Sequence, residues 1–287
     1  MTIPFYIVDV FAEEKYKGNQ LAVFLDAENL SYAQMLEIAR ETNFAESTFI
    51  TAVGAQSGIV TIRIFTPQHE MQFAGHPIIG TSWLLMNKIL DDRPQEITIL
   101  VPVGAIPVRQ EVDLVWLQAA QPEFFSTYSA SDFLNFTNFS LEDLETEFPI
   151  QEVTTGSAFV LVPVKSVNAL KNLVVNQDKM DQWLRENCNS AHRAFYFFCL
   201  EDENSTSRML CIENGKLIED PATGSASSCL QAFLLKYHKS EIKMINFQGD
   251  FINRPSQIHF EGSLIDNHYD IKIGGKTKFV ASGQWEV

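Results

Sequence analysis

Three residues of this 287-residue sequence have side chains that could together move a proton: Glu46, His76 and Asp220. Two carboxyl groups in different environments can differ in proton affinity, and an imidazole can donate or accept a proton near neutral pH. Each residue alone has an ordinary explanation, because most of the 36 acidic residues are expected in solvent and a histidine can be a core group. As a set, they are candidates for general acid–base catalysis.

Two of these residues lie in glycine motifs that are typical of helix starts, residues 73–77 (FAGHP) and residues 219–225 (EDPATGS). Pro77 suits the first helical position, which places His76 near the N-cap, and Ser225 is expected to cap the second helix. The first amides of a helix can hold a carboxylate or stabilise an enolate-like anion. The alternative is that both motifs are ordinary caps and tight turns.

Both motifs lead into segments that are apolar nearly all round. Residues 77–90 contain a single charged residue, Lys88, and residues 224–235 contain none. A helix without a polar face is buried, and short apolar strands dominate the rest of the chain, so each helix is expected inside a curved sheet. The likeness of the two segments indicates an internal duplication, with chance resemblance between small-residue helix starts as the alternative.

The predicted fold class is therefore α/β, in the α+β sense: two similar halves, each a curved, mostly antiparallel sheet around one buried helix. Residues 1–120 are expected to form the N-terminal half and residues 121–277 the C-terminal half. The last strand, about 278–287, is a candidate to return to the first half. If the halves face each other, both helix starts open on one cleft, which is the expected active site. Residues 31–42 predict a further helix, capped by Ser31.

The composition excludes several kinds of partner. The chain has 36 acidic and 21 basic residues, a net charge of −15, and such a surface repels nucleic acid and anionic lipid. The longest uncharged apolar stretch, residues 97–108, contains two prolines and a glycine and is too short to span a membrane. The first residues lack the basic start and long apolar run of a secretory signal. The 22 phenylalanines are expected to fill the core.

Cysteine and histidine usage gives no metal pattern. The four cysteines form no C-x-x-C pair and have no histidine at ligand spacing, so they are expected to be reduced thiols of a cytoplasmic protein. The histidines are scattered, and no phosphate-binding loop, G-x-S-x-G or H-E-x-x-H motif occurs. No metal site is expected.

The motifs and their order along the chain indicate a resemblance to known proteins. The motifs are DVF at 9–11, GN at 18–19, IARE at 38–41, NFAESTF at 43–49, RIFTP at 63–67, FAGHP at 73–77, EDPATGSA at 219–226, RPS at 254–256 and GG at 274–275. With them the chain resembles the phenazine-biosynthesis PhzF-like family of the diaminopimelate epimerase-like superfamily. The similarity spans nearly the whole chain, and EDPATGSA is its most specific element.

The resemblance implies the diaminopimelate epimerase-like fold with the active site between the two halves. It also implies an isomerase that needs no cofactor or metal, acts on a small carboxylate-bearing molecule and forms a homodimer. By the same resemblance, Glu46 is the carboxylate that moves the proton, and His76, Asp220 and Ser225 line the pocket and assist.

The resemblance further implies that Gly75 and Gly224 supply backbone donors and that Asn19 lies near the substrate. Two positions depart from the family pattern. Gln20 replaces the proline that follows Asn19, and Ala45 stands where many members have serine. These departures affect the contact of Asn19 and one hydrogen bond beside the catalytic carboxylate.

A comparison with thiol-dependent racemases of the same fold narrows the chemistry. In those enzymes a cysteine precedes each glycine of the paired motifs, whereas Ala74 and Thr223 occupy these positions here. Cys211 and Cys229 lie at other offsets. Stereoinversion by two thiols is therefore disfavoured. One carboxylate that shifts a proton between two carbons, in a 1,3-type or double-bond isomerisation, is expected instead.

Two other classes of function remain open from the sequence. The protein could be a non-catalytic small-molecule binder that keeps the fold, or a small-molecule hydrolase in which Glu46 and His76 act on water. A binder would exchange no substrate proton with solvent, and a hydrolase would give a product whose mass differs by one water.

Overall fold

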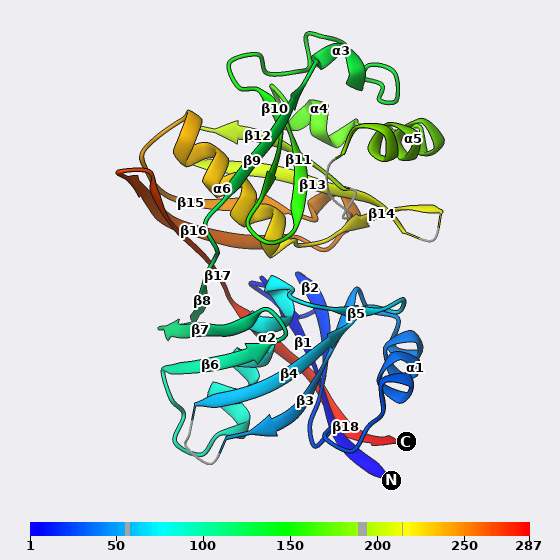
Figure 1. Ribbon diagram of the computed structural model, residues 1–287, viewed down its shortest axis with the longest axis vertical. Coiled ribbons are helices and arrows are strands. Elements are labelled where there is room, and N and C mark those ends of the chain that lie inside the picture. Colours follow the sequence, from blue (N-terminus) through cyan, green and yellow to red (C-terminus); the bar gives the residue numbers. More distant parts are fainter. Residues whose placement is uncertain (55–57, 189–193, 214) are drawn as a thin grey trace. The chain divides into compact units, whose positions relative to one another are not determined.

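The contacts within the chain divide it into two units, residues 1–118 with 274–287, and residues 119–273. The computed structural model describes residues 1–54, 58–188, 194–213 and 215–287, and Figure 1 shows their helices and strands. Each unit has its own set of paired strands and its own buried helix.

The first unit is built on one mostly antiparallel sheet. Its strands are β1 (Thr2–Val10), β2 (Asn19–Phe24), β3 (Glu46–Val53), β4 (Ile59–Phe65), β5 (Glu70–Met71), β6 (Glu96–Val101), β7 (Gly104–Glu111), β8 (Leu114–Gln118) and β18 (Thr277–Glu286). They pair in the order β18–β1–β2–β3–β4–β6–β7–β8, with β5 also beside β4. Only the pairs β2–β3 and β4–β6 of this order are parallel.

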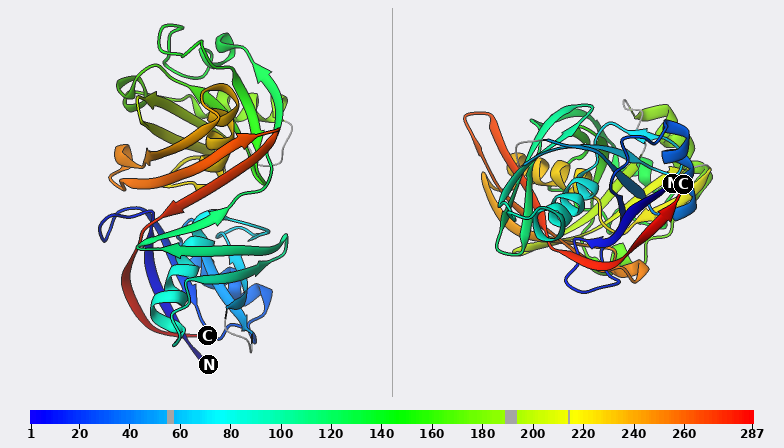
Figure 2. Two further views of the ribbon diagram at one scale, coloured as in Figure 1. Left: turned by 90° about the vertical axis from the view of Figure 1, so that its left-hand side faces the viewer. Right: turned by 90° about the horizontal axis from the view of Figure 1, so that it is seen from below.

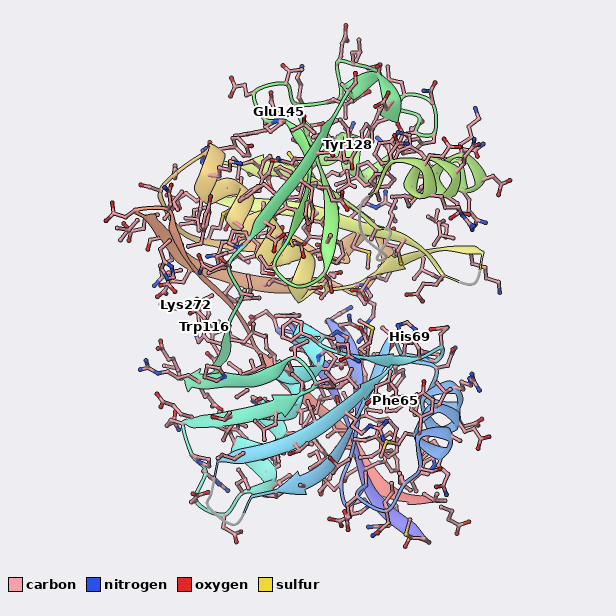
Figure 3. The ribbon with its side chains drawn as sticks, in the orientation of Figure 1. Phe65, His69, Trp116, Tyr128, Glu145 and Lys272 are labelled. Carbon is pink, nitrogen blue, oxygen red and sulfur yellow. The ribbon has the colours of Figure 1, made fainter. Side chains whose placement is uncertain are left out.

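Helix α1 (Tyr32–Thr42) covers one side of this sheet. Ser31 caps it as predicted: its hydroxyl accepts from the Gln34 backbone amide, and the Gln34 side chain accepts from the Ser31 backbone. The buried face of α1 packs on Phe49 and Phe65 of the sheet. Figure 3 shows Phe65 between β4 and α1.

Helix α2 (Gly75–Leu84) is the buried helix of the first unit and continues as a π-helical turn, Leu85–Ile89. The strands that it contacts include β1, β2, β3, β6, β7, β8 and β18, because the sheet curves around it. Gly80 allows this close approach: a Cβ there would lie 2.6 Å from Val10 and 2.8 Å from Leu21. The prediction of a buried helix over residues 77–90 is thus confirmed, with a start two residues earlier.

The second unit repeats this plan. Its strands are β9 (Glu123–Tyr128), β10 (Ile150–Thr154), β11 (Ala158–Pro163), β12 (Ala194–Glu201), β13 (Asn204–Glu213), β14 (Lys216–Asp220), β15 (Glu241–Gln248), β16 (Ser256–Ile265) and most of β17 (His268–Gly275). The pairing order is β9–β10–β11–β12–β13–β15–β16, with β14 beside β13. Here the pairs β11–β12 and β13–β15 are parallel.

Helix α6 (Gly224–Tyr237) is the buried helix of the second unit and packs on β10, β11, β15 and β16 (Figure 1). The other helices are α3 (Ala130–Phe133), α4 (Val167–Lys171), α5 (Gln177–Asn187) and a 3-10 turn, Asp250–Ile252. On the face of the sheet that α4 and α5 cover, the core is rich in phenylalanine, including Phe133, Phe136, Phe195 and Phe197. This confirms that phenylalanines fill the core.

The two units match strand for strand, so the internal duplication predicted from the sequence is present in the fold. In both, antiparallel hairpins are joined by two parallel pairs, β2–β3 and β4–β6 in the first unit and β11–β12 and β13–β15 in the second. A short strand, β5 or β14, lies beside β4 or β13. The predicted α/β fold class, with two similar halves and one buried helix in each, is confirmed.

The two ends of the described chain meet in the first unit. The Met1 amino group donates to the Val287 carbonyl at 3.2 Å, and the Val287 amide donates to the Met1 carbonyl at 2.8 Å. Figure 2 shows β1 and β18 running side by side to these ends. In the part of the chain described, no helix has the length and apolar character to cross a membrane.

Candidate active site

Glu46 and His76 come together in the first unit, although thirty residues of chain separate them. Glu46 is the first residue of β3 and His76 the second residue of α2. His76 Nε2 lies 3.5 Å from Glu46 Oε2, and the two side chains are 5% and 17% exposed. The structure therefore places a partly accessible carboxyl group against a buried imidazole.

The imidazole of His76 is neutral at physiological pH. Burial lowers its pKa from 6.5 to about 3, and a hydrogen bond with the backbone of Gln20 opposes this shift only in part. The contact with Glu46 is therefore not an ion pair, and 3.5 Å is long for a hydrogen bond. His76 gives this carboxyl group a polar neighbour without a positive charge.

Asn19 belongs to the same cluster. It is the first residue of β2 and is 2% exposed, and its amide nitrogen lies 3.4 Å from His76 Nδ1. The chain reaches this position through Gly18, whose φ of 69° and close approach to the Val10 carbonyl favour glycine. Asn19, His76 and Glu46, predicted separately from the sequence, thus form one contiguous group.

The starts of the two buried helices differ in detail from the prediction. Helix α2 begins at Gly75 with Ala74 as N-cap, and α6 begins at Gly224 with Thr223 as N-cap. The expected capping roles of His76 and Ser225 are therefore wrong, as is Pro77 at the first helical position. Glycine takes the first helical position in both helices, which moves every assignment by one or two residues.

Neither N-cap side chain makes a capping hydrogen bond. The first-turn amides of α2 and α6 are consequently not satisfied by their own caps, in contrast to α1. Gly75 and Gly224 are both buried, and Ser225 is half-buried. The two helix starts keep the donor character that an anion requires.

Asp220, the last residue of β14, lies in the second unit with Gly224 and Ser225. The strand is held by Arg208 of β13, which donates to both carboxylate oxygens of Glu219 at 3.0 and 2.6 Å and to the Leu170 carbonyl at 2.8 Å. The first unit has the equivalent pair, Arg63 with Glu70, at 2.7 Å for both bonds. Bidentate pairs of this kind fix the short strand that precedes each motif.

Two residues that the sequence did not single out for a role are close to Asp220. The Thr223 hydroxyl is 2.5 Å from Asp220 Oδ2, and the amide of Gln248 bonds both the Asp220 backbone and the Thr223 hydroxyl. Gln248 ends β15, so no local pattern connects it with a motif 25 residues earlier.

Two of the thiols, those of Cys199 and Cys229, are unsuited to base catalysis. All four cysteines are free, and burial raises the pKa of Cys229 in α6 to about 12 and that of Cys199 to about 11. Thiols with such pKa values stay protonated near neutral pH. Within residues 1–54, 58–188, 194–213 and 215–287, no three histidine, cysteine or acidic side chains are grouped to hold a metal ion.

We expect His76 to make stability depend on pH. The folded chain binds this proton only below about pH 3, whereas the unfolded chain binds it below 6.5. The stabilisation is therefore complete above pH 6.5 and is lost as the pH falls, by up to about 1.4 kcal/mol per pH unit. Urea unfolding of wild type and His76→Asn at pH 7, 6 and 5 measures this pH dependence. Between pH 7 and 5 the free energy of unfolding should fall more for the wild type than for His76→Asn.

The exposed His268 provides the matched control, because His268→Asn should keep the wild-type pH dependence. If His76→Asn and wild type lose stability in parallel between pH 7 and 5, the imidazole is not held neutral in the folded state.

The model of the phenazine biosynthesis-like protein family (PhzC-PhzF) matches residues 8–283. The chain is 33% identical over 266 residues to the trans-2,3-dihydro-3-hydroxyanthranilate isomerase of Pseudomonas aeruginosa, covering 89% of this chain and 88% of the relative. It is 29% identical over 282 residues to an uncharacterised isomerase of Pasteurella multocida, covering 98% and 93%.

A solved structure, the PhzF-family phenazine biosynthesis protein of Bacillus anthracis, superimposes with a TM-score of 0.88 at 24% identity over 100% of both chains. Fold and relatives together define an isomerase with the duplicated α/β architecture predicted above. The chain belongs to the phenazine biosynthesis-like (PhzF) family.

Proposed function

We propose that the protein isomerises a small carboxylate-bearing molecule without a cofactor, by moving a proton with Glu46 as the acid–base group. The observation that carries this proposal is the Glu46 carboxyl group 3.5 Å from the buried, neutral His76. A carboxylate beside a neutral group keeps its basicity better than one that is paired with a cation. A base of that kind is what a C–H proton transfer requires.

In the proposed reaction the Glu46 carboxylate removes a proton from a carbon next to an unsaturated system. The C–H electron pair enters the conjugated system, and Glu46 holds the proton. The same carboxyl group then returns the proton to another carbon of the conjugated system, so the double bonds shift and the atomic composition is unchanged. The amides of Gly75 and His76 at the start of α2 are the proposed donors that stabilise the anion.

The residues of the second unit are assigned to the same substrate by this proposal. Asp220 and Ser225 are proposed to bind its polar groups, and Gly224 to donate a backbone hydrogen bond. Asn19 is proposed to contact the substrate while it holds the His76 ring. The family resemblance also suggests a homodimer, which sedimentation of the purified chain would measure.

The first substrate to test is trans-2,3-dihydro-3-hydroxyanthranilate, because the Pseudomonas aeruginosa relative that carries its name is 33% identical to this chain. The compound is incubated with the protein in deuterium oxide, and the product is followed by proton NMR and mass spectrometry. We expect a double-bond isomer of the same composition. Its deuterium content reports how far the proton held by Glu46 exchanges with solvent.

Other outcomes decide between the alternatives. A product heavier by one water would favour the hydrolase. A compound that binds but is recovered unchanged and unlabelled would favour the binding protein, once other small unsaturated carboxylic acids have given the same result.

A further inference from the structure

A set of buried polar side chains lies next to the start of α6 in the second unit. We call it the Gln248 network, and its members are Tyr196, Ser207, Thr223, Asn246 and Gln248. All are at most 8% exposed. The Tyr196 hydroxyl is its centre and is 2.8 Å from Ser207 Oγ, 2.9 Å from Asn246 Nδ2 and 2.9 Å from Gln248 Oε1. The donors and acceptors of the network satisfy one another.

The orientation of the Gln248 amide group is fixed by the backbone. Its oxygen accepts from the Thr223 amide at 3.2 Å, and its nitrogen donates to the Asp220 carbonyl at 2.8 Å. A flipped amide would place two donors or two acceptors against each other at both contacts. The nitrogen is therefore also the group that faces the Thr223 hydroxyl, at 2.9 Å.

This orientation determines the direction of the next hydrogen bond. A hydroxyl has one proton, and the Thr223 hydroxyl already accepts from Gln248. Its own proton is thus free to point at Asp220 Oδ2, 2.5 Å away. A carboxylate accepts such a bond in its ionised form, and short bonds of this kind favour that form over the protonated one. Gln248 thereby acts on Asp220 through Thr223.

The first unit shows that the fold does not need four of these five polar side chains. The two units can be aligned through their strand registers with Arg63 equivalent to Arg208. In this alignment the counterparts of Ser207, Asn246 and Gln248 in the first unit are Ile62, Ile99 and Val101. These three counterparts are buried apolar residues. Ala74 likewise takes the N-cap position of Thr223. Only the counterpart of Tyr196, the buried Thr48, is polar. The same architecture thus exists with apolar side chains at the other four positions, which avoids the cost of burying polar groups there.

The network is therefore better explained by the residue it contacts than by folding. We propose that Gln248 and Thr223 are positioning residues that hold Asp220 as a carboxylate with one oxygen fixed. This inference rests on the proposed function for its catalytic meaning: Asp220 then binds a donor group of the substrate, and Glu46 alone carries the proton in both transfers.

The test is a carbon-13 NMR titration of the full chain with labelled aspartate, the Asp220 signal being identified by its loss in Asp220→Asn. In Thr223→Ala we expect the titration midpoint of that signal to rise by about one pH unit, because a charge-assisted hydrogen bond is lost. Ala74 at the equivalent cap indicates that this variant folds. Thr223→Ser should restore the wild-type midpoint. Gln248→Leu should raise the Asp220 midpoint by about half as much, since Gln248 no longer orients the Thr223 hydroxyl proton toward Asp220.

Ser205→Ala is the matched control, because Ser205 is fully buried and bonds Asn246 at 2.8 Å without touching Thr223 or Asp220. It should leave the midpoint unchanged. Equal midpoints in Thr223→Ala and wild type would overturn the proposal, as would a shift in Ser205→Ala as large as that in Gln248→Leu. The titration needs no substrate, so it decides this proposal even if the isomerase activity is not found.

With turnover established, a second readout separates positioning from loss of structure. Thr223→Ala should shift the acidic limb of the kcat/KM profile to higher pH, and Thr223→Ser should return it. A uniform loss of activity at every pH, with the limb unmoved, would contradict the proposed role in the reaction.

Discussion

The Glu46→Gln variant is expected to lose about 10³-fold in kcat while its melting temperature stays close to that of the wild type. The glutamine amide has nearly the same shape as the carboxyl group, so its contact with His76 at 3.5 Å can remain. It cannot take a proton from carbon at neutral pH. Activity on trans-2,3-dihydro-3-hydroxyanthranilate, or on the acid that the deuterium experiment identifies, is the measurement.

Glu41→Gln is the control for this change. Glu41 is exposed on α1, five residues before Glu46, and the substitution removes the same charge from the same unit. Its kcat should stay within about twofold of wild type. A Glu46→Gln protein that keeps its activity would remove Glu46 from the mechanism and leave the isomerase without its base.

The Gly249→Ala variant should be strongly destabilised. Gly249 has a φ of +82°, and a Cβ at this position would meet the Arg254 carbonyl and lie 2.6 Å from the Pro221 carbonyl. Both obstacles are backbone atoms, which no side-chain rotation relieves. We expect a loss of about 3 kcal/mol in the free energy of unfolding, measured in urea. The displaced Pro221 segment should also lower activity.

Gly215→Ala separates the two causes. Gly215 has a similar φ of +70°, but nothing lies within 4 Å of the position its Cβ would take. It should therefore show the conformational cost alone, about 1 kcal/mol. If both variants lose equal stability, the close approach of Gly249 to the Pro221 segment contributes nothing.

Most of the fold could be predicted because its signals are local. Ser31 and Gln34 form a capping box within four residues, and the apolar character of residues 77–90 and 224–235 identifies both buried helices without any knowledge of partners. The likeness of the two apolar segments also predicts the internal duplication. The helix starts were misplaced by one or two residues because glycine at the first helical position leaves no side-chain signal.

The sequence motifs include all three residues of the group around Glu46, namely Asn19, Glu46 and His76. They do not identify the contacts that Thr223 and Gln248 make with Asp220. Thr223 lies inside the EDPATGSA motif, but the sequence indicates only that no cysteine occupies this position. No sequence motif indicates a role for Gln248, because its contact with Asp220 depends on the pairing of β15 with β13. Contacts of this kind are set by strand register, which the hydrophobic pattern of one strand does not determine.

The duplicated plan has a consequence for how such a chain can change. An ancestor with two identical halves would carry the same groups at both glycine-led helices, whereas this chain has an imidazole at one and a hydroxyl–carboxylate pair at the other. Since each helix is enclosed by strands of its own unit, mutations could specialise one copy without loosening its twin. Selection can then alter the groups at either helix start independently.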